Sequence, residues 1–125
     1  MIIDGFIKSG FSNFYISTHF LANVITDYFG DGKQFGVSIK YVHEETPLGT
    51  GGALALLPKD LPDLPLIMIN GDVVTDLDYE GLIRYHESSD CEATICVREF
   101  TYKVPFGVIK TDERNRVVDM VEKPE

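Results

Sequence analysis

The stretch Glu44–Leu54 reads EETPLGTGGAL, and it is the most informative part of the chain. Two carboxylates and a proline lead into three glycines within four residues, and an apolar helical run follows. Glycine lets the backbone approach a ligand closely and adopt dihedral angles that side chains forbid. A helix that opens just after such a loop points free N–H groups toward whatever lies above it. The stretch therefore predicts a strand that leads through a tight loop into a helix.

Strand and helix patterns alternate on both sides of this stretch. Helices are expected over residues 2–7, 21–29, 52–57 and from Asp76 or Asp78 to Ser88. Strands are expected over residues 13–18, 37–43, 66–69, 93–98, 107–111 and 117–121. The continuous apolar run 66–69 is typical of a strand that is buried on both faces. We therefore expect one α/β domain over residues 1–125, with a sheet that is parallel at first and antiparallel at the end.

The composition excludes several classes of function. A net charge of −9 argues against a nucleic-acid partner or an anionic membrane surface. No run approaches the roughly 18 apolar residues of a membrane span, and the first residues lack a basic leader. Cys91 and Cys96 are expected to be reduced thiols in a cytoplasmic protein. His19, His43 and His86 show no metal-ligand spacing, which favours structural or exposed roles.

The glycine-rich loop, Leu48–Gly52, matches neither of two common phosphate-binding motifs. No lysine follows the glycines, and a leucine stands where a dinucleotide fingerprint has its third glycine. A tight turn between a strand and a helix is one interpretation, and a backbone platform for a flat base or a sugar is the other. A carboxylate accepts well from the N1–H and N2–H₂ donors of guanine, and Glu44 or Glu45 is suited to that part. A solvated acidic pair is the alternative.

Acidic residues also follow the run 66–69. Asp72 is suited to Mg²⁺, which takes one or two carboxylates together with phosphate oxygens, and Gly71 permits close approach of a ligand. An acidic cap for the next turn is the alternative. The Asp76-Leu77-Asp78 sequence resembles the metal-binding Asp-x-Asp of many glycosyltransferases, but helix capping explains both of its acids.

A third group of residues lies near the end of the chain. Glu122 and Lys123 combine an acceptor for hydroxyl groups with a cation for phosphate, and Gly107 stands at a strand start where a ligand can pass close. Ligands of open parallel sheets bind at the carboxyl ends of the strands. We therefore expect the three groups to converge on one nucleotide-sugar site.

Six segments in this order and spacing resemble the sugar-1-phosphate nucleotidyltransferases, also called nucleoside-diphosphate-sugar pyrophosphorylases. They are Phe14–Ser17, Tyr28–Gly32, Pro47–Gly52, Asn70–Asp72, Pro105–Val108 and Glu122–Pro124. The loop and Glu44 look most like the guanylyltransferase branch, with mannose-1-phosphate and amino-sugar-1-phosphate enzymes. The resemblance implies a Rossmann-like mixed sheet and transfer of a nucleotidyl group from a nucleoside triphosphate to a sugar 1-phosphate, with Mg²⁺ and release of pyrophosphate.

The resemblance also implies roles for particular residues. A nucleotide would be held by Glu44, Leu48, Gly49, Thr50, Gly51, Gly52 and Gly71. Asp72 would hold the metal. Gly107 would lie against the sugar, Glu122 would accept hydrogen bonds from its hydroxyls, and Lys123 would meet its phosphate.

The chain departs from the family pattern in two places. The family's first strand, with its Gly-Gly-x-Gly-Thr-Arg loop and Pro-Lys-Pro, and a second metal-binding Asp have no match in these 125 residues. We therefore expect an interior fragment that lacks the first central strand and is nearly inactive alone, because the missing donors stabilise charge during transfer. Strand edges left without a neighbour predict self-association. A non-catalytic regulatory or assembly module, and a glycosyltransferase that uses a nucleotide sugar, remain alternatives.

Overall fold

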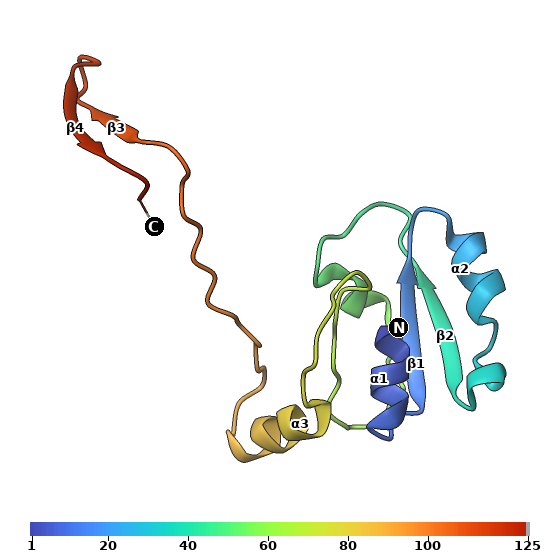
Figure 1. The fold of residues 1–125 in the computed structure, drawn as a ribbon. Helices are drawn as coiled ribbons and strands as arrows, with labels where there is room; N and C mark the ends of the chain where they lie inside the picture. Colours follow the sequence, from blue (N-terminus) through green and yellow to red (C-terminus); the bar gives the residue numbers. More distant parts are fainter. Residues whose placement is uncertain (125) are drawn as a thin grey trace. The chain divides into compact units, whose positions relative to one another are not determined.

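A computed structural model describes residues 1–124 of the chain. They form two compact units, the first spanning Met1–Cys91 and the second beginning at Glu92. Both units are drawn in Figure 1, in which the colours follow the sequence. The single domain expected over residues 1–125 stays a prediction.

The first unit is built around a pair of parallel strands. Its elements are α1 (Ile2–Lys8), β1 (Asn13–Thr18), α2 (Ala22–Phe29), the 3₁₀ turn η1 (Lys33–Phe35), β2 (Ser38–His43), the 3₁₀ turn η2 (Gly52–Leu56) and α3 (Tyr79–Ser88). β1 pairs with β2 from Asn13 opposite Ser38 to Thr18 opposite His43. Both strands therefore end at the same edge, where the glycine-rich loop begins (Figure 1).

An aromatic cluster joins α1 to α3 in the first unit. Phe6 and Tyr79 are both buried, and their rings stack with centroids 4.0 Å apart. Phe11 meets the Phe6 ring edge-on at 5.3 Å. Such aromatic pairs contribute about 0.5–1.5 kcal/mol beyond the area that they bury. Asp78 caps the start of α3 by accepting a hydrogen bond from the Gly81 N–H at 2.9 Å, which confirms the expected cap.

The connection between α2 and β2 is fixed by hydrogen bonds to its backbone. The Tyr41 hydroxyl donates to the Gly30 carbonyl at 2.7 Å, and the Ile39 N–H donates to the Asp31 carbonyl at 3.0 Å. Gly32 is buried beneath these contacts and has a φ of +86°. A side chain at that position would require an unfavourable backbone conformation in a space that is already filled.

The second unit contains an antiparallel hairpin made by β3 (Val108–Thr111) and β4 (Val117–Val121). The carboxylate of Asp112 organises the turn between these strands. It accepts from the N–H groups of Arg114 and Arg116, and the Arg116 side chain pairs with it at 2.8 Å. The expected antiparallel strands and the turn between them are confirmed.

Two expected strands are absent from the described residues. Residues 66–69 carry no strand assignment, and Leu66 and Met68 are 51% and 42% exposed, so the strand buried on both faces was wrong. Residues 93–98 are likewise without secondary structure. Both segments have the apolar pattern of a strand, but a strand requires a hydrogen-bonded neighbour, and no strand within residues 1–124 pairs with either.

Residues 1–124 therefore form a mixed α/β structure with one small parallel sheet and one small antiparallel sheet. The expected helix at 52–57 is the short 3₁₀ turn η2. No helix within residues 1–124 has the length and apolar character needed to cross a membrane.

Gly32 provides a test of the connection between α2 and β2. A Cβ on this residue would lie 2.7 Å from the Val37 carbonyl oxygen and 2.8 Å from Ile39 Cγ1. Gly36 also has a positive φ, +74°, but a Cβ there meets nothing within 4 Å. We expect Gly36→Ala to lower the free energy of unfolding by about 1–2 kcal/mol through backbone strain. Gly32→Ala is expected to cost about 1–3 kcal/mol more through overlap with its neighbours.

The free energies of unfolding of the two variants are measured by urea unfolding. Their difference isolates the cost of the steric overlap at Gly32. Equal destabilisation by Gly32→Ala and Gly36→Ala would contradict the packing described for Gly32.

Candidate functional site

Glu44 follows β2 directly and links the two strand ends to the glycine-rich loop. One oxygen of its carboxylate accepts a hydrogen bond from the Ser17 hydroxyl, and the other accepts from the Leu48 N–H at 2.9 Å. The Glu44 N–H donates to the Thr18 carbonyl at 2.9 Å. The Glu44 carbonyl lies 2.7 Å from His19 Nδ1, so that ring nitrogen must carry the hydrogen if the two are bonded. Every polar group of Glu44 thus has a partner within the first unit.

These contacts favour the ionised form of Glu44. The hydrogen bond from Ser17, followed by the one from the Leu48 N–H, lowers the pKa of the Glu44 carboxyl below its ordinary value of 4.5. Partial desolvation opposes this shift, and the nearby imidazoles of His19 and His43 add smaller contributions in the same direction as the hydrogen bonds. A carboxylate with these partners holds the loop against the strand ends at neutral pH.

The three glycines of the loop differ in what the structure requires of them. Gly49 has a φ of +76°, which disfavours any other residue. A Cβ on Gly52 would overlap the Cβ of Leu48, so the packing of Leu48 requires that glycine. Gly51 has neither constraint, because a Cβ there would meet nothing within 4 Å. Open space above Gly51 is what close approach of a ligand to the backbone needs.

A hollow of about 280 Å³ lies beside the glycine-rich loop in the first unit. Its lining residues are His43, Glu45, Thr46, Leu48 and Leu56. This volume is just below the range of about 300–1,000 Å³ that is common for small-molecule pockets. The hollow is therefore large enough for part of a ligand, such as a base, and offers it two leucines and one carboxylate.

The segment Asn70-Gly71-Asp72 forms an exposed turn, in which the Val73 N–H donates to the Asn70 carbonyl at 3.3 Å. A Cβ on Gly71 would meet nothing within 4 Å. The packing of the fold therefore does not require glycine at position 71, and the same holds for Gly51. Because residues 66–69 are not a strand, this turn does not mark a strand end as the sequence suggested.

Asp72 is the residue predicted to hold Mg²⁺, and the structure shows how many protein ligands such an ion could have. Within residues 1–124, no three His, Cys, Asp or Glu side chains form a group suited to a metal ion. Mg²⁺ commonly uses one or two carboxylates and completes its shell with phosphate oxygens and water. The exposed carboxylate of Asp72 fits such a shared site, in which the ligand supplies most of the oxygens.

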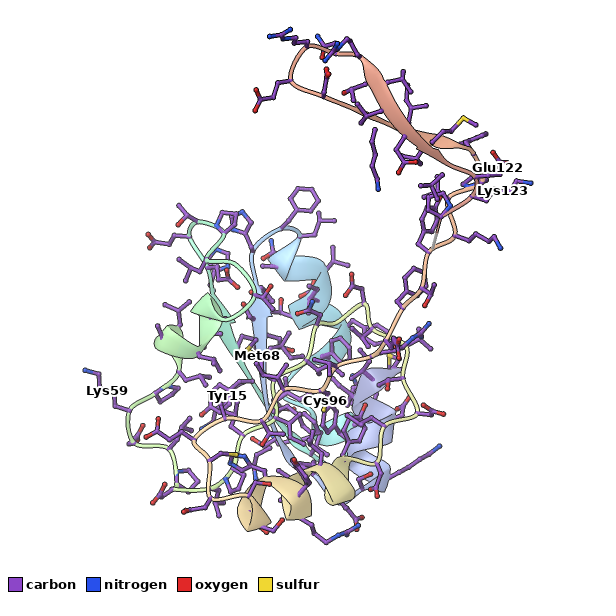
Figure 2. The ribbon with its side chains drawn as sticks, turned by 90° about the vertical axis from the view of Figure 1, so that its left-hand side faces the viewer. Tyr15, Lys59, Met68, Cys96, Glu122 and Lys123 are labelled. Carbon is purple, nitrogen blue, oxygen red and sulfur yellow. The ribbon has the colours of Figure 1, made fainter. Side chains whose placement is uncertain are left out.

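The residues predicted to meet a sugar phosphate lie in the second unit. Gly107 and Glu122 are neighbours there, because a Cβ on Gly107 would lie 3.0 Å from Glu122 Oε2. Lys123 follows Glu122 directly beyond β4, and both are labelled in Figure 2. Lys123 has a φ of +47°, a left-handed conformation that is uncommon for a residue other than glycine. The structure thus brings Gly107, Glu122 and Lys123 into one local set.

The candidate residues therefore form separate groups whose internal geometry is known. Glu44 and the loop lie together in the first unit, which also holds Gly71 and Asp72, while the Gly107 set belongs to the second unit. Convergence of all these residues on one crevice stays a prediction. The sequence did not reveal that Ser17 contacts Glu44. The available signal was that Ser17 carries a hydroxyl near the end of one strand, while Glu44 directly follows the next strand along the chain.

Comparison with known proteins identifies the family. The sequence pattern of the family described as Nucleotidyl transferase matches residues 1–125.

The chain belongs to the nucleotidyl transferase family.

Several relatives are similar to nearly the whole chain. A mannose-1-phosphate guanylyltransferase of Mycobacterium tuberculosis is 35% identical over 124 residues, which are 99% of this chain and 34% of that protein. A mannose-1-phosphate guanylyltransferase catalytic subunit beta of Dictyostelium discoideum is 31% identical over 126 residues, which are 98% of this chain and 35% of that protein. The chain thus spans about a third of the length of these relatives, and the resemblance to the guanylyltransferase branch is confirmed.

Ser17 provides a test of the contacts around Glu44. A carboxyl group whose pKa is lower in the folded protein than in the unfolded protein stabilises the fold at pH values above its unfolded pKa. That stabilisation is lost as the pH falls through the pKa of the folded protein. We expect protection of the Leu48 amide to fall as the pH drops below 4.5 and through the lowered pKa of Glu44. Ser17→Ala should raise that pKa toward 4.5, so protection is lost at a higher pH.

NMR titration of the Glu44 carboxyl carbon measures this shift. Ser38→Ala, at the exposed start of β2, serves as a control and should leave the titration unchanged. An unaltered Glu44 pKa in Ser17→Ala would show that the hydroxyl does not stabilise the carboxylate.

Proposed function

We propose that this chain forms part of a sugar-1-phosphate guanylyltransferase, which converts a nucleoside triphosphate and a sugar 1-phosphate into a nucleoside-diphosphate sugar and pyrophosphate. The observation that carries the proposal is the glycine-rich loop, which Glu44 fixes at the ends of two parallel strands beside an open hollow. The relatives are mannose-1-phosphate guanylyltransferases, which favours GTP and mannose 1-phosphate as the substrates, with an amino-sugar 1-phosphate as the alternative.

In this proposal the two units hold different parts of the substrates. Glu44, Leu48–Gly52 and Gly71 form the nucleotide side, where unobstructed backbone at Gly51 and Gly71 permits close approach. Gly107, Glu122 and Lys123 form the sugar-phosphate side. Glu122 accepts hydrogen bonds from sugar hydroxyls, and Lys123 neutralises phosphate charge. Mg²⁺ bound through Asp72 would supply positive charge to the phosphates of the nucleotide.

We infer a Rossmann-like mixed sheet of the nucleotide-diphospho-sugar transferase type, without the family's first central strand, in a cytoplasmic protein. The 125 residues hold no match to the Gly-Gly-x-Gly-Thr-Arg loop or to Pro-Lys-Pro. Loss of one donor that stabilises developing charge commonly costs about 10²–10³ in rate. The chain alone therefore binds its substrates weakly and turns them over very slowly.

A second candidate is a non-catalytic regulatory or assembly module of the same fold. The glycosyltransferase alternative has less support, because the Asp78 carboxylate is used to cap α3. The two remaining candidates differ in what they bind, since a module need not bind both a nucleoside triphosphate and a sugar 1-phosphate.

Ligand binding and pyrophosphate release together test the proposed function. We expect NMR titration of the full chain to detect GTP and mannose 1-phosphate at millimolar concentrations. Lys123→Ala should weaken the sugar phosphate about tenfold, the size of one lost charge-assisted contact, and leave GTP unaffected. Lys59→Ala removes an exposed lysine outside the proposed site and serves as a control. If GTP or mannose 1-phosphate fails to bind, the proposed function is contradicted. Rapid release of pyrophosphate would contradict the expected inactivity of the chain alone.

We further propose that the chain associates with a second copy of itself. Within residues 1–124, β1 has β2 as its one strand neighbour, so its other edge has no strand partner. Apolar side chains along 93–100 are also exposed, with Ile95 at 81% and Val97 at 89%. An exposed segment with this pattern is suited to strand pairing between copies.

Light scattering across a dilution series measures this association. We expect a concentration-dependent mass, and Val97→Lys should reduce it because a charge opposes pairing of apolar strands. Val24→Lys places the same charge at an exposed position of α2, where Val24 is 61% exposed, and should have little effect. A constant monomeric mass at all concentrations would disprove the association.

A further inference from the structure

Asn70 and Gly71 form an asparagine–glycine pair in an exposed turn of the first unit. The turn is closed by one hydrogen bond, in which the Val73 N–H donates to the Asn70 carbonyl at 3.3 Å. Within residues 1–124, no hydrogen bond holds the side-chain amide of Asn70 or the N–H of Gly71. These two groups can react with each other, and the fold restrains neither of them.

An asparagine that precedes a glycine can cyclise onto the backbone. The Gly71 nitrogen loses its proton to base and attacks Cγ of Asn70, so a C–N bond forms while the bond from Cγ to Nδ2 breaks and ammonia leaves. Water then adds to either carbonyl of the cyclic imide and breaks one of its C–N bonds. The product is aspartate, or isoaspartate with the chain running through the side-chain carbonyl. The net change consumes water and releases ammonia, without an oxidant or a reductant.

The same reaction is hindered at Asn13 and Asn23, which lie in regular structure. Asn13 is the first residue of β1, which pairs with β2 along its whole length, and Asn23 lies in α2. The nitrogen that would attack Asn23 belongs to Val24, and its N–H already donates to the Leu21 carbonyl at 3.0 Å. Both asparagines also precede a bulky residue, Phe14 or Val24, which restricts the backbone more than glycine does.

Asn115 provides the closest comparison, because it also lies in an exposed turn. The nitrogen that would attack it belongs to Arg116, and the Arg116 N–H donates to the Asp112 carboxylate at 3.0 Å. The N–H of Asn115 itself donates to the Asp112 carbonyl at 3.0 Å. The attacking nitrogen is therefore engaged in a hydrogen bond at Asn115, whereas the corresponding nitrogen of Gly71 is not.

We propose that Asn70 is a site of spontaneous deamidation in the folded chain, and that the other asparagines are protected. Deamidation adds a negative charge to a chain whose net charge is already −9, and it does so two residues from Asp72. Isoaspartate also inserts a methylene group into the backbone of the turn. The reaction needs only water and base, so it does not depend on the proposed function, but it changes the segment that carries Asp72.

Incubation of the full chain at neutral and alkaline pH tests this proposal. Mass spectrometry of proteolytic peptides locates the modification, and electron-transfer fragmentation distinguishes isoaspartate from aspartate. We expect both products at position 70, since direct hydrolysis of the side-chain amide would yield aspartate alone. The rate should rise about tenfold per pH unit, because the deprotonated fraction of a weak acid grows by that factor at pH values below its pKa.

Gly71→Ala is the matched variant for the reaction. A Cβ at this position meets nothing within 4 Å, so the fold accepts alanine. The methyl group restricts the backbone and hinders the approach of the nitrogen to Cγ of Asn70, so we expect deamidation to slow several-fold. Val74→Ala changes a fully exposed side chain close to the same turn and should leave the rate at Asn70 unchanged.

The same incubation in urea measures the rate at Asn70 without the fold. If Asn70 is modified in urea but stays intact in the folded chain, the turn protects it and the proposal is wrong. Equal modification of Asn13, Asn23 and Asn115 in the folded chain would contradict the protection assigned to them. An unchanged rate in Gly71→Ala would exclude attack by the Gly71 nitrogen.

Discussion

The hydrogen bonds of the Glu44 carboxylate are the constraint on which the geometry of the candidate site depends. β1 and β2 end at the same edge because they pair in parallel and in register, but pairing alone does not place the chain that leaves that edge. Glu44 does so, because it accepts from Ser17 on one side and from the Leu48 N–H on the other. Those two bonds tie the loop to the ends of the strands and place Leu48, which forms one wall of the hollow.

This arrangement also addresses a problem of charge. The chain carries a net charge of −9, and no lysine or arginine occurs between Tyr41 and Pro58, around the loop. The Glu44 carboxylate stays ionised, but the donor groups of Ser17 and Leu48 point their positive ends at it and so partly offset its charge toward an anionic ligand. Under the proposed function, phosphate groups that approach the loop would depend on backbone N–H groups and a metal ion, and Lys123 is the proposed cation for the sugar phosphate.

The sequence was most informative where local chemistry determines structure. Asp78 was expected to cap α3 and does so, and the alternating pattern of β2 predicted a strand correctly. Residues 66–69 and 93–98 have equally strong apolar patterns but form no strand in the described residues, because a strand depends on a neighbour that a local pattern does not reveal. The candidate site shows the same limit. The glycines of the loop were recognisable, but the link from Ser17 joins residues 27 positions apart and required the paired strands to be seen.

The hollow beside the glycine-rich loop is the proposed place of the nucleotide base. The most direct measurement is an isotope-filtered NOE experiment on the full chain with GTP, which detects contacts between protons of the base and protein methyl groups. We expect NOEs from the guanine H8 and the ribose H1′ to the methyl groups of Leu48 and Leu56. Contacts to methyl groups elsewhere in the chain, with none to these two leucines, would contradict it.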